Sequence, residues 1–261
     1  MRGPFVSRQL KRGFQNVHHK LDFPGGAGGI GRAAAQIMGR QGASLFITDV
    51  GSEAGETAVA GWRERGIEAA FIPADLTDVA QIRALFRRVE EQARRIDVLV
   101  TCAGISSLTP APEISPEEWD RVFAVNLKAV FFCCQEALRS MVKRKQGKIV
   151  TVASAAAKIG GVAVGAHYSA SKAGIICLTK SLALYGAAHG INVNCVCPGP
   201  TETPMTDAWG KAINTEFAQK IPFKRYGTPE EIAEVIAFLA SERASYVTGE
   251  TVDVNGGLVM D

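Results

Sequence analysis

The sequence predicts an α/β fold in which a doubly wound parallel sheet carries helices on both faces, giving three α/β/α layers. Strand-like apolar runs alternate with helix-like stretches along most of the chain, and repeated strand–helix units of this kind form parallel sheets. The chain has 261 residues, 47% of them hydrophobic, which is enough to bury the core of one such domain. We found no internal repeat or linker that would divide it.

The chain is expected to form a single domain over residues 23–261, preceded by a basic extension with a doubtful first strand over residues 1–22. Residues 1–20 contain five basic residues and no acidic one. The remaining 24 basic and 26 acidic residues leave the body of the protein slightly acidic. This balance disfavours nucleic acid as a partner.

Targeting signals are weak in this sequence. The N-terminal segment lacks the continuous apolar run of a signal peptide, and no stretch approaches the ~20 apolar residues of a membrane span. We therefore expect a cytoplasmic protein without a membrane partner. The basic, acid-free start also resembles a mitochondrial transit segment, so the mitochondrial matrix is the alternative location.

The cysteine pattern predicts buried free thiols rather than a metal site or disulfides. The six cysteines lie in apolar stretches without CxxC spacing or a nearby group of histidines, and such thiols occur in reducing compartments. They are Cys102, Cys133, Cys134, Cys177, Cys195 and Cys197. No metal is expected.

The elements are expected in a regular order after a glycine cluster at residues 25–31 and the helix-forming stretch that follows it. Expected strands span residues 43–48, 69–74, 97–102, 148–152, 192–196 and 250–254. Expected helices span residues 53–65, 79–95, 116–145 with a break near Asn126, 168–189 and 229–240. Ligands of doubly wound sheets bind outside the carboxyl ends of the strands, where the candidate functional residues fall.

The glycine cluster at residues 25–31 is typical of a turn that binds a pyrophosphate. Its glycines permit a tight turn and let backbone N–H groups approach the phosphates at the start of a helix. Asp49 ends the next strand, eighteen residues after Gly31, near the place of an acid that binds ribose hydroxyls. A carboxylate there repels a 2′-phosphate, and neither Gly28 nor Val50 is basic, so the sequence favours NAD over NADP.

A tyrosine and a lysine lie four residues apart at the start of the helix-like stretch 168–189. Tyr168 and Lys172 share one helix face, with Cβ atoms roughly 5–6 Å apart. The ammonium group is therefore expected to stabilise the phenolate and lower the pKa of the tyrosine, which would then exchange a proton with a substrate oxygen. Because chance alone supplies roughly 0.2 such spacings in this chain, the surrounding motifs decide the interpretation.

Several motifs in one order resemble the short-chain dehydrogenase/reductase family over residues 24–257. They are Gly25-x-x-x-Gly29-x-Gly31, Cys102-Ala103-Gly104, Asn126, Ser154, Tyr168-x-x-x-Lys172 and Pro198-Gly199. The resemblance implies a Rossmann-type fold and an NAD(H)-dependent oxidoreductase that transfers hydride between a secondary alcohol or ketone and the nicotinamide. It also implies a homotetramer.

The resemblance implies a role for each matching residue. Tyr168 would be the general acid/base, with Lys172 lowering its pKa and binding the nicotinamide ribose. Ser154 would hold the substrate oxygen, and Asn126 would position Lys172 and a proton-relaying water. The residues implied in cofactor binding are Gly25, Gly28, Gly29, Ile30, Gly31, Asp49, Asp75, Leu76, Ala103, Gly104, Tyr168, Lys172, Pro198, Gly199 and Thr203.

Two places depart from the family pattern. Residues 16–23 read as a poor buried strand, and Pro24 stands where a threonine is usual, although central parallel strands are rich in Val and Ile and proline lacks the ladder N–H. Thr101 and Cys102 replace a frequent asparagine pair. The altered first strand leaves open a non-catalytic alternative, a scaffold or nucleotide-responsive protein that binds the cofactor weakly.

Substrate specificity is expected to reside in the loop-and-helix segment 200–222. Other possible contacts are Ser106, Ser107, Ala156 and His167, although His167 and Ile159 are expected chiefly to pack. The segment has no arginine for a bidentate carboxylate clamp, so a small-molecule secondary alcohol or ketone is as specific as the sequence allows. Apolar residues on more than one face of helices 116–145 and 168–189 predict burial against another subunit.

Overall fold

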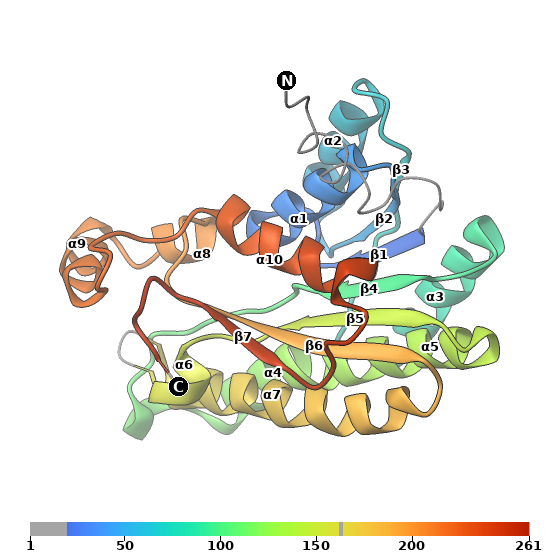
Figure 1. Cartoon of the computed structure of the whole chain (residues 1–261). Coiled ribbons are helices and arrows are strands. Elements are labelled where there is room, and N and C mark those ends of the chain that lie inside the picture. The colour runs from blue at the N-terminus through green and yellow to red at the C-terminus, as the bar shows by residue number, and fades with distance from the viewer. Residues whose placement is uncertain (1–19, 162–163, 261) are drawn as a thin grey trace, which may run out of the picture.

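The fold was analysed in a computed structural model, which describes residues 20–161 and 164–260 (Figure 1). Seven strands form one parallel sheet in the order β3-β2-β1-β4-β5-β6-β7. The strands are β1 (Lys20–Pro24), β2 (Ser44–Thr48), β3 (Ala69–Phe71), β4 (Val98–Thr101), β5 (Gly147–Val152), β6 (Ile191–Pro198) and β7 (Thr251–Val254). The predicted doubly wound α/β/α fold is confirmed, and its strand order reverses between β1 and β4, where such sheets bind ligands.

Helices cover both faces of the sheet (Figure 1). One face carries α1 (Gly29–Arg40), α2 (Ser52–Arg63) and α10 (Pro229–Leu239), and the other carries α3 (Val79–Ala93), α5 (Ala129–Arg144) and α7 (Ala166–Ala187). Alternate residues of the central strands enter the two cores: Val98 and Val100 pack on the first face, and Leu99 packs on the second. Strands buried on both faces have apolar residues at consecutive positions, as these do.

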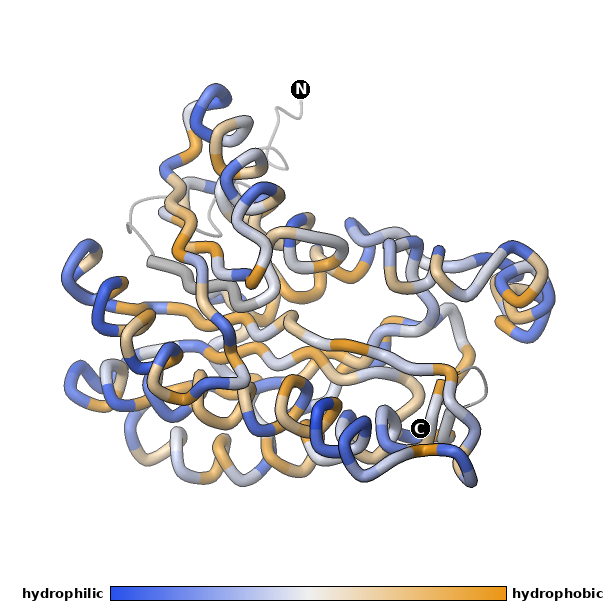
Figure 2. Tube along the Cα trace, turned by 180° about the vertical axis from the view of Figure 1, so that it is seen from behind, coloured by the Kyte–Doolittle hydropathy of each residue, from blue (hydrophilic) through white to orange (hydrophobic). Residues whose placement is uncertain are grey.

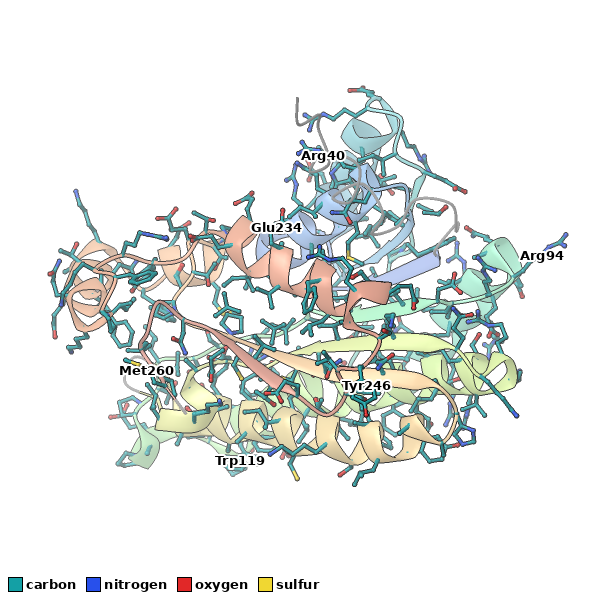
Figure 3. The ribbon with its side chains drawn as sticks, viewed as in Figure 1. Arg40, Arg94, Trp119, Glu234, Tyr246 and Met260 are labelled. Carbon is teal, nitrogen blue, oxygen red and sulfur yellow. The ribbon has the colours of Figure 1, made fainter. Side chains whose placement is uncertain are left out.

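Apolar residues follow the strands and the inward faces of the helices, whereas hydrophilic residues gather on the outer turns (Figure 2). Charged side chains such as Arg40, Arg94 and Glu234 project away from the sheet (Figure 3). This distribution is the amphipathic pattern of helices that cover a sheet. None of the helices in the described part of the chain is both long and apolar enough to span a membrane.

Local sequence signals set the starts of several helices. The Asp78 side chain accepts a hydrogen bond from the Ala80 amide at the start of α3, 2.8 Å away, as an N-cap residue does. Thr228 and Glu231 form a capping box at the start of α10, where Pro229 occupies the first turn, and both features favour a helix start. These ends agree with the helix starts expected at residues 79 and 229.

The expected break near Asn126 is a π-helical turn, η2 (Ala124–Lys128), between α4 (Pro116–Phe123) and α5. The expected loop-and-helix segment 200–222 contains two helices, α8 (Pro204–Asp207) and α9 (Lys211–Lys220). The remaining short elements are η1 (Ala111–Glu113), α6 (Ala156–Ile159) and η3 (Glu242–Ala244).

Strand β1 forms in the centre of the sheet despite Pro24. The Gly25 amide donates to the Thr48 carbonyl of β2, 2.8 Å away, and amides alternate sides along a strand, so the position of the missing Pro24 amide faces β4. The register of β1 with β4 covers only Leu21 and Asp22. Pro24 therefore falls where that ladder has already ended, which is where a strand tolerates proline.

The predicted domain boundary between residues 22 and 23 falls inside β1. The basic segment over residues 1–19, on which the mitochondrial alternative depended, lies outside the described residues.

The cysteine prediction holds except at two positions. None of the six cysteines, all of them in the described part of the chain, forms a disulfide, and Cys133, Cys134, Cys195 and Cys197 are buried. Cys102 is half-buried, and Cys177 is exposed, so the expectation of buried thiols is wrong for these two. Helix α7 is apolar around most of its circumference, and its sequence therefore does not reveal which face, including that of Cys177, points away from the sheet.

Candidate active site

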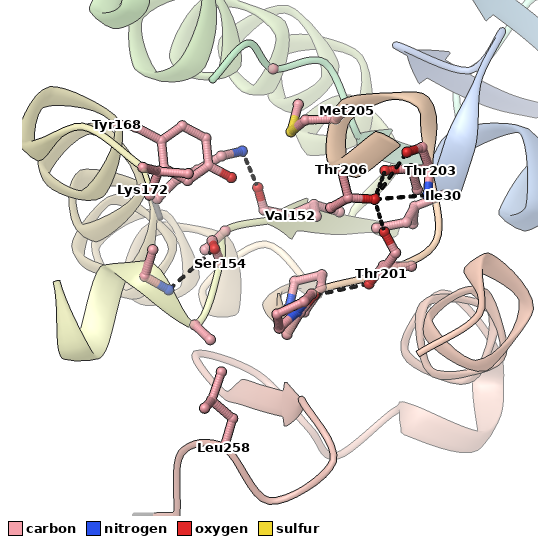
Figure 4. Close-up of a pocket in the computed structure, with 18 of the residues that line it drawn as sticks. Ile30, Val152, Ser154, Tyr168, Lys172, Thr201, Thr203, Met205, Thr206 and Leu258 are labelled. Carbon is pink, nitrogen blue, oxygen red and sulfur yellow. Dashed lines mark hydrogen bonds between the residues drawn. The ribbon is translucent and has the colours of Figure 1, made fainter. Parts of the chain in front are cut away.

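The four candidate catalytic residues come from three elements at the carboxyl end of the sheet. Asn126 lies in the η2 turn, Ser154 follows β5 by two residues, and Tyr168 and Lys172 occupy the first two turns of α7. Ser154, Tyr168 and Lys172 line one pocket (Figure 4). Asn126 is fully buried behind it.

Asn126 connects the loop after β4 to helix α7. Its Oδ1 accepts the Ile105 amide at 2.9 Å, and its Nδ2 donates to the Ile105 carbonyl and the Ser171 Oγ, each at 3.0 Å. Ser171 Oγ in turn donates to the Tyr168 carbonyl at 2.7 Å. The π turn, a feature frequent at functional sites, thus holds Asn126 against the turn that carries Tyr168. Ser171 was missed from the sequence because it has no motif of its own.

Lys172 is almost fully buried, and its ammonium group is held by the backbone. Nζ donates to the Val152 carbonyl at 2.9 Å and lies 5.9 Å from the centre of the Tyr168 ring (Figure 4). A Cβ atom at Gly104 would come within 3.3 Å of Nζ, so glycine leaves room for the ammonium. Burial disfavours the charged form and lowers the pKa of Lys172 to about 8.

The pKa of Tyr168 shifts upward, opposite to the expectation from its spacing with Lys172. Burial raises this pKa, and the hydrogen bond with Ser154 opposes the rise. The expected lowering is wrong in this structure because burial outweighs the contributions that favour the phenolate. A phenol of this kind stays protonated at neutral pH and is suited to donate a proton.

The glycine turn before α1 forms a cradle that fits a pyrophosphate. A side chain at Gly25, which has a φ of +78°, would overlap Ala103, and one at Gly31 would overlap the Gly25 carbonyl. Gly28, the N-cap residue of α1, offers no side-chain cap and has open space around it. The first amides of α1 are thus accessible to an anion at the positive end of the helix.

A groove continues from this turn along the ends of β2, β3 and β4. It is lined by Asp49, Val50, Asp75, Leu76 and Thr77, and its described lining contains no arginine or lysine. The Thr77 side chain and amide hydrogen-bond to Asp75 and lower the pKa of its carboxyl group. A lining with two carboxylates and no cation suits the hydroxyls of a ribose and disfavours a 2′-phosphate on that ribose.

The predicted cofactor residues divide between this groove and the pocket. Those that line the groove are Gly25, Gly28, Gly29, Ile30, Gly31, Asp49, Asp75, Leu76, Ala103, Gly104 and Thr203. Those that line the pocket are Ile30, Gly104, Tyr168, Lys172, Pro198, Gly199 and Thr203. Gly104, Val152 and Thr203 line both, so the two spaces join beside Lys172.

The pocket in front of Tyr168 has mainly apolar walls from distant segments. Met205, Trp209 and Phe217 come from the predicted specificity segment, and Ile159 and Leu258 complete the wall. Leu258 was missed because nothing in the C-terminal sequence indicates that it returns to the site. Ala156 lines the pocket as expected, whereas Ser106, Ser107 and His167 do not. Ile159 therefore contacts the pocket rather than only packing.

Cys102 borders both the groove and the pocket as a neutral thiol. Burial raises the pKa of the Cys102 thiol to about 12. The thiol therefore stays neutral and forms part of the wall at a position where the family frequently has an asparagine. Among the described residues, no cluster of three metal-ligating side chains could hold an ion.

This fold and arrangement define the class of protein. A family model described as Enoyl-(Acyl carrier protein) reductase matches residues 25–259. The chain belongs to the short-chain dehydrogenase/reductase family, as its motifs predicted, and is an oxidoreductase of that family.

Among its relatives are proteins named 3-oxoacyl-[acyl-carrier-protein] reductase. The one from Staphylococcus aureus (strain N315) is 37% identical over 237 residues, covering 90% of this chain and 96% of the relative. The one from Thermotoga maritima is 38% identical over 238 residues, covering 90% of this chain and 96% of the relative.

Two solved structures extend this likeness. The 3-oxoacyl-[acyl-carrier protein] reductase from Brucella melitensis has a TM-score of 0.90 and 32% identity, covering 100% of this chain and 98% of its own. A variant of the actinorhodin polyketide ketoreductase, solved with NADPH, has a TM-score of 0.87 and 35% identity, covering 92% of this chain and 97% of its own.

Proposed function

We propose that the protein is an NAD(H)-dependent reductase and dehydrogenase that interconverts a ketone and a secondary alcohol. The observation that carries this proposal is the meeting of the Ser154, Tyr168 and Lys172 pocket with the groove beneath the glycine turn. The glycine cradle and the carboxylates of the groove fit a dinucleotide whose nicotinamide would reach the pocket.

The chain's own residues would supply a proton, alignment and charge stabilisation. When bound, NADH would supply the hydride for the carbonyl carbon. Ser154 and Tyr168 would donate hydrogen bonds to the carbonyl oxygen, and Tyr168 would release its proton to that oxygen as the C–O bond becomes single. The Lys172 ammonium, 5.9 Å from the ring centre, would stabilise the tyrosinate left behind. In the oxidising direction the same tyrosine would accept the proton.

The substrate we favour is a 3-oxoacyl thioester, in which the ketone has an extended uncharged chain. The names of the relatives support this class. The pocket walls support it as well, because Lys172 is the only described residue with an ammonium or carboxylate group that lines the pocket. Beyond Val164 and Phe217 a second groove continues between residues 108–111 and α9, in a position to take the chain beyond the reacting ketone.

A substrate panel tests the proposed function. Purified protein with NADH should reduce 3-oxoacyl thioesters and simple ketones, monitored as loss of the NADH absorbance, with thioesters giving the higher kcat/KM. A charged 3-oxo acid of equal length is the matched comparison, since the described pocket lining offers no carboxylate clamp. Absence of turnover with every ketone and both nucleotides would contradict an enzyme.

We propose that NAD(H) is preferred over NADP(H), for which Asp49 and the cation-free described lining of the groove are the support. The NADPH in the actinorhodin ketoreductase structure supports the alternative. Titration with NADH and NADPH, followed by protein fluorescence, should give at least about tenfold tighter binding of NADH, a difference of roughly 1.4 kcal/mol. Equal affinities would remove the argument from Asp49.

The non-catalytic alternative, a scaffold or nucleotide-responsive protein, depended on a defective first strand. Strand β1 pairs along its whole length with β2, which favours the enzyme. The same titration tests the alternative, because a scaffold of this kind binds neither nucleotide tightly.

We further propose a cytoplasmic homotetramer without a nucleic-acid or membrane partner. Phe131, Leu184 and Tyr185 are exposed on α5 and α7, on the two helices predicted to face another subunit. Large apolar side chains gathered on one surface are typical of subunit contacts. Light scattering after size-exclusion chromatography tests the state, and a monomer would contradict it.

A further inference from the structure

The turn of α7 that carries Tyr168 begins without a cap of its own. Its N-cap residue, Gly165, provides no side-chain acceptor, and its first turn contains no acidic residue. Helix starts are normally stabilised by a capping side chain or by negative charge near the first amides. The turn that must hold the phenol in place is therefore stabilised by other parts of the chain.

A carboxylate from α4 lies beside this turn. Glu118 Oε1 is 3.3 Å from Nε2 of His167, the residue before Tyr168, in a polar contact without hydrogen-bond alignment, and it accepts a hydrogen bond from Thr109 Oγ1 at 2.8 Å. Hydrogen bonds from the Ser107 and Thr109 hydroxyls lower the pKa of Glu118. Glu118 is thus an anion at neutral pH, placed near the positive end of α7.

The loop after β4 joins this contact to the Asn126 network. Ser107 Oγ lies 2.7 Å from Thr109 Oγ1, and the Ser107 carbonyl accepts the Gly165 amide at 2.7 Å. The same loop binds Asn126 through Ile105. The first turn of α7 is therefore contacted from two sides, by the hydrogen bonds of Asn126 through Ser171 and by the polar contact of Glu118 with His167.

The His167 ring transmits any movement to the backbone. Its side chain is fully buried. Trp119, an exposed residue of α4 (Figure 3), stacks on it with ring centres 6.4 Å apart and planes 22° apart. A Cβ atom at Gly165 would overlap the imidazole. Because the ring is buried and packed against Gly165 and Trp119, a change in its position should be passed on to the adjacent Tyr168.

We propose that Glu118 is a positioning residue, which acts through His167 to hold the Tyr168 phenol in line with Ser154 and the substrate oxygen. The inference rests on the proposed function, in which Tyr168 transfers the proton. Glu118 does not line the pocket, so its effect should fall on the chemical step and not on substrate or nucleotide binding. A displacement of about 1 Å can cost about 100-fold in rate.

Glu118→Ala, Glu118→Gln and the matched control Glu117→Ala test the proposal, because Glu117 is an exposed acid in the same first turn of α4. Glu118→Ala should lower kcat by at least about tenfold and raise the solvent deuterium isotope effect on kcat, as a poorly aligned proton transfer becomes slower. The KM for the ketone and the Kd for NADH should stay within about twofold. Amide hydrogen exchange over residues 165–171 should become faster.

Glu118→Gln keeps an acceptor oxygen and should restore most of kcat, while Glu117→Ala should match the parent in every measurement. Unchanged amide hydrogen exchange over residues 165–171 in Glu118→Ala would overturn the inference. Equal losses of kcat in Glu118→Ala and Glu118→Gln, together with a higher KM and a lower Tm, would also overturn it. If the parent reduces no ketone, the proposed function fails by itself, and the exchange measurement still decides whether Glu118 holds the turn.

Discussion

The groove under the glycine turn and the pocket in front of Tyr168 meet at Gly104 and Val152 but are built in different ways. The groove is lined by five glycines and two carboxylates together with apolar side chains. The pocket is formed by apolar side chains from distant segments and contains a buried ammonium group. On the proposed function, the groove would select a nucleotide by backbone shape and charge, whereas the pocket would select a ketone by side-chain volume and supply the proton of Tyr168.

This difference implies that the two sites can be altered independently. Asp49 lines only the groove, and Tyr168 and Leu258 line only the pocket. A change in the groove should shift nucleotide preference without changing the chemical step. A change in the pocket should alter turnover or substrate binding while NADH affinity is preserved. Each of the following variants tests this separation, in order of decreasing effect.

The largest effect is expected from Tyr168→Phe, which removes the proton donor and little else. General acid–base catalysis contributes about 10²–10⁴-fold, so kcat should fall by at least about 100-fold. The Kd for NADH, measured by fluorescence titration, should remain within about twofold of the parent. Tyr246→Phe, at a fully exposed tyrosine, is the control. Turnover near the parent value would show that the proton comes from another group.

In the groove, the double variant Asp49→Ser, Val50→Arg should reverse the nucleotide preference. It removes the carboxylate that opposes a 2′-phosphate and adds a cation at an exposed neighbouring position. A charge-assisted hydrogen bond contributes about 1.5–3 kcal/mol, so the ratio of NADH to NADPH affinity should change by roughly 10–100-fold or more. With each preferred nucleotide, kcat should stay near the parent value. A fall in kcat for both nucleotides would contradict the independence of the two sites.

In the pocket, Lys172→Met should reveal the cost of burying an ammonium group. Burial lowers the pKa of Lys172 from 10.5 to about 8. Between these values the unfolded chain binds one more proton than the folded protein, so the parent becomes more stable as the pH rises. From pH 7 to pH 9.5 the parent should gain about 2 kcal/mol of unfolding free energy relative to Lys172→Met.

Urea unfolding of both proteins at the two pH values measures this gain, because the difference between them removes the contribution of other titrating groups. Lys180→Met, at an exposed position on the same helix, should show no such pH dependence. If the difference in unfolding free energy between the parent and Lys172→Met were equal at both pH values, burial would not lower the pKa of Lys172.

The same contrast explains which parts of the molecule could be predicted. The groove depends on local features, since glycine spacing and an acid at the end of a strand are visible in the sequence. The pocket depends on contacts between distant segments. Leu258 and Ser171 were missed for this reason, because each acquires its role only when the C-terminus or the π turn is brought beside α7.

Two expectations failed because the three-dimensional environment outweighs spacing. Tyr168 and Lys172 do share a helix face, but the Val152 carbonyl binds the ammonium and burial raises the pKa of the phenol. Pro24 reads as a strand breaker, yet the register of β1 with β4 has ended at Asp22 before the missing amide is needed. Residue spacing predicts neither how deeply a side chain is buried nor where the hydrogen bonding between two strands ends.

The smallest and most selective effect is expected from Leu258→Ala at the wall of the pocket. Removing part of an apolar side chain that contacts the substrate loses roughly 1–2 kcal/mol, so the KM for the preferred ketone should rise about 5–30-fold. The kcat and the Kd for NADH should change less than about twofold, since uniform binding is lost and the proton donor is untouched. Phe238→Ala, at an exposed position on α10, should leave all three constants unchanged. A parallel loss of NADH affinity in Leu258→Ala would show that the wall of the pocket also shapes the groove, and the two sites would then have to be treated as one.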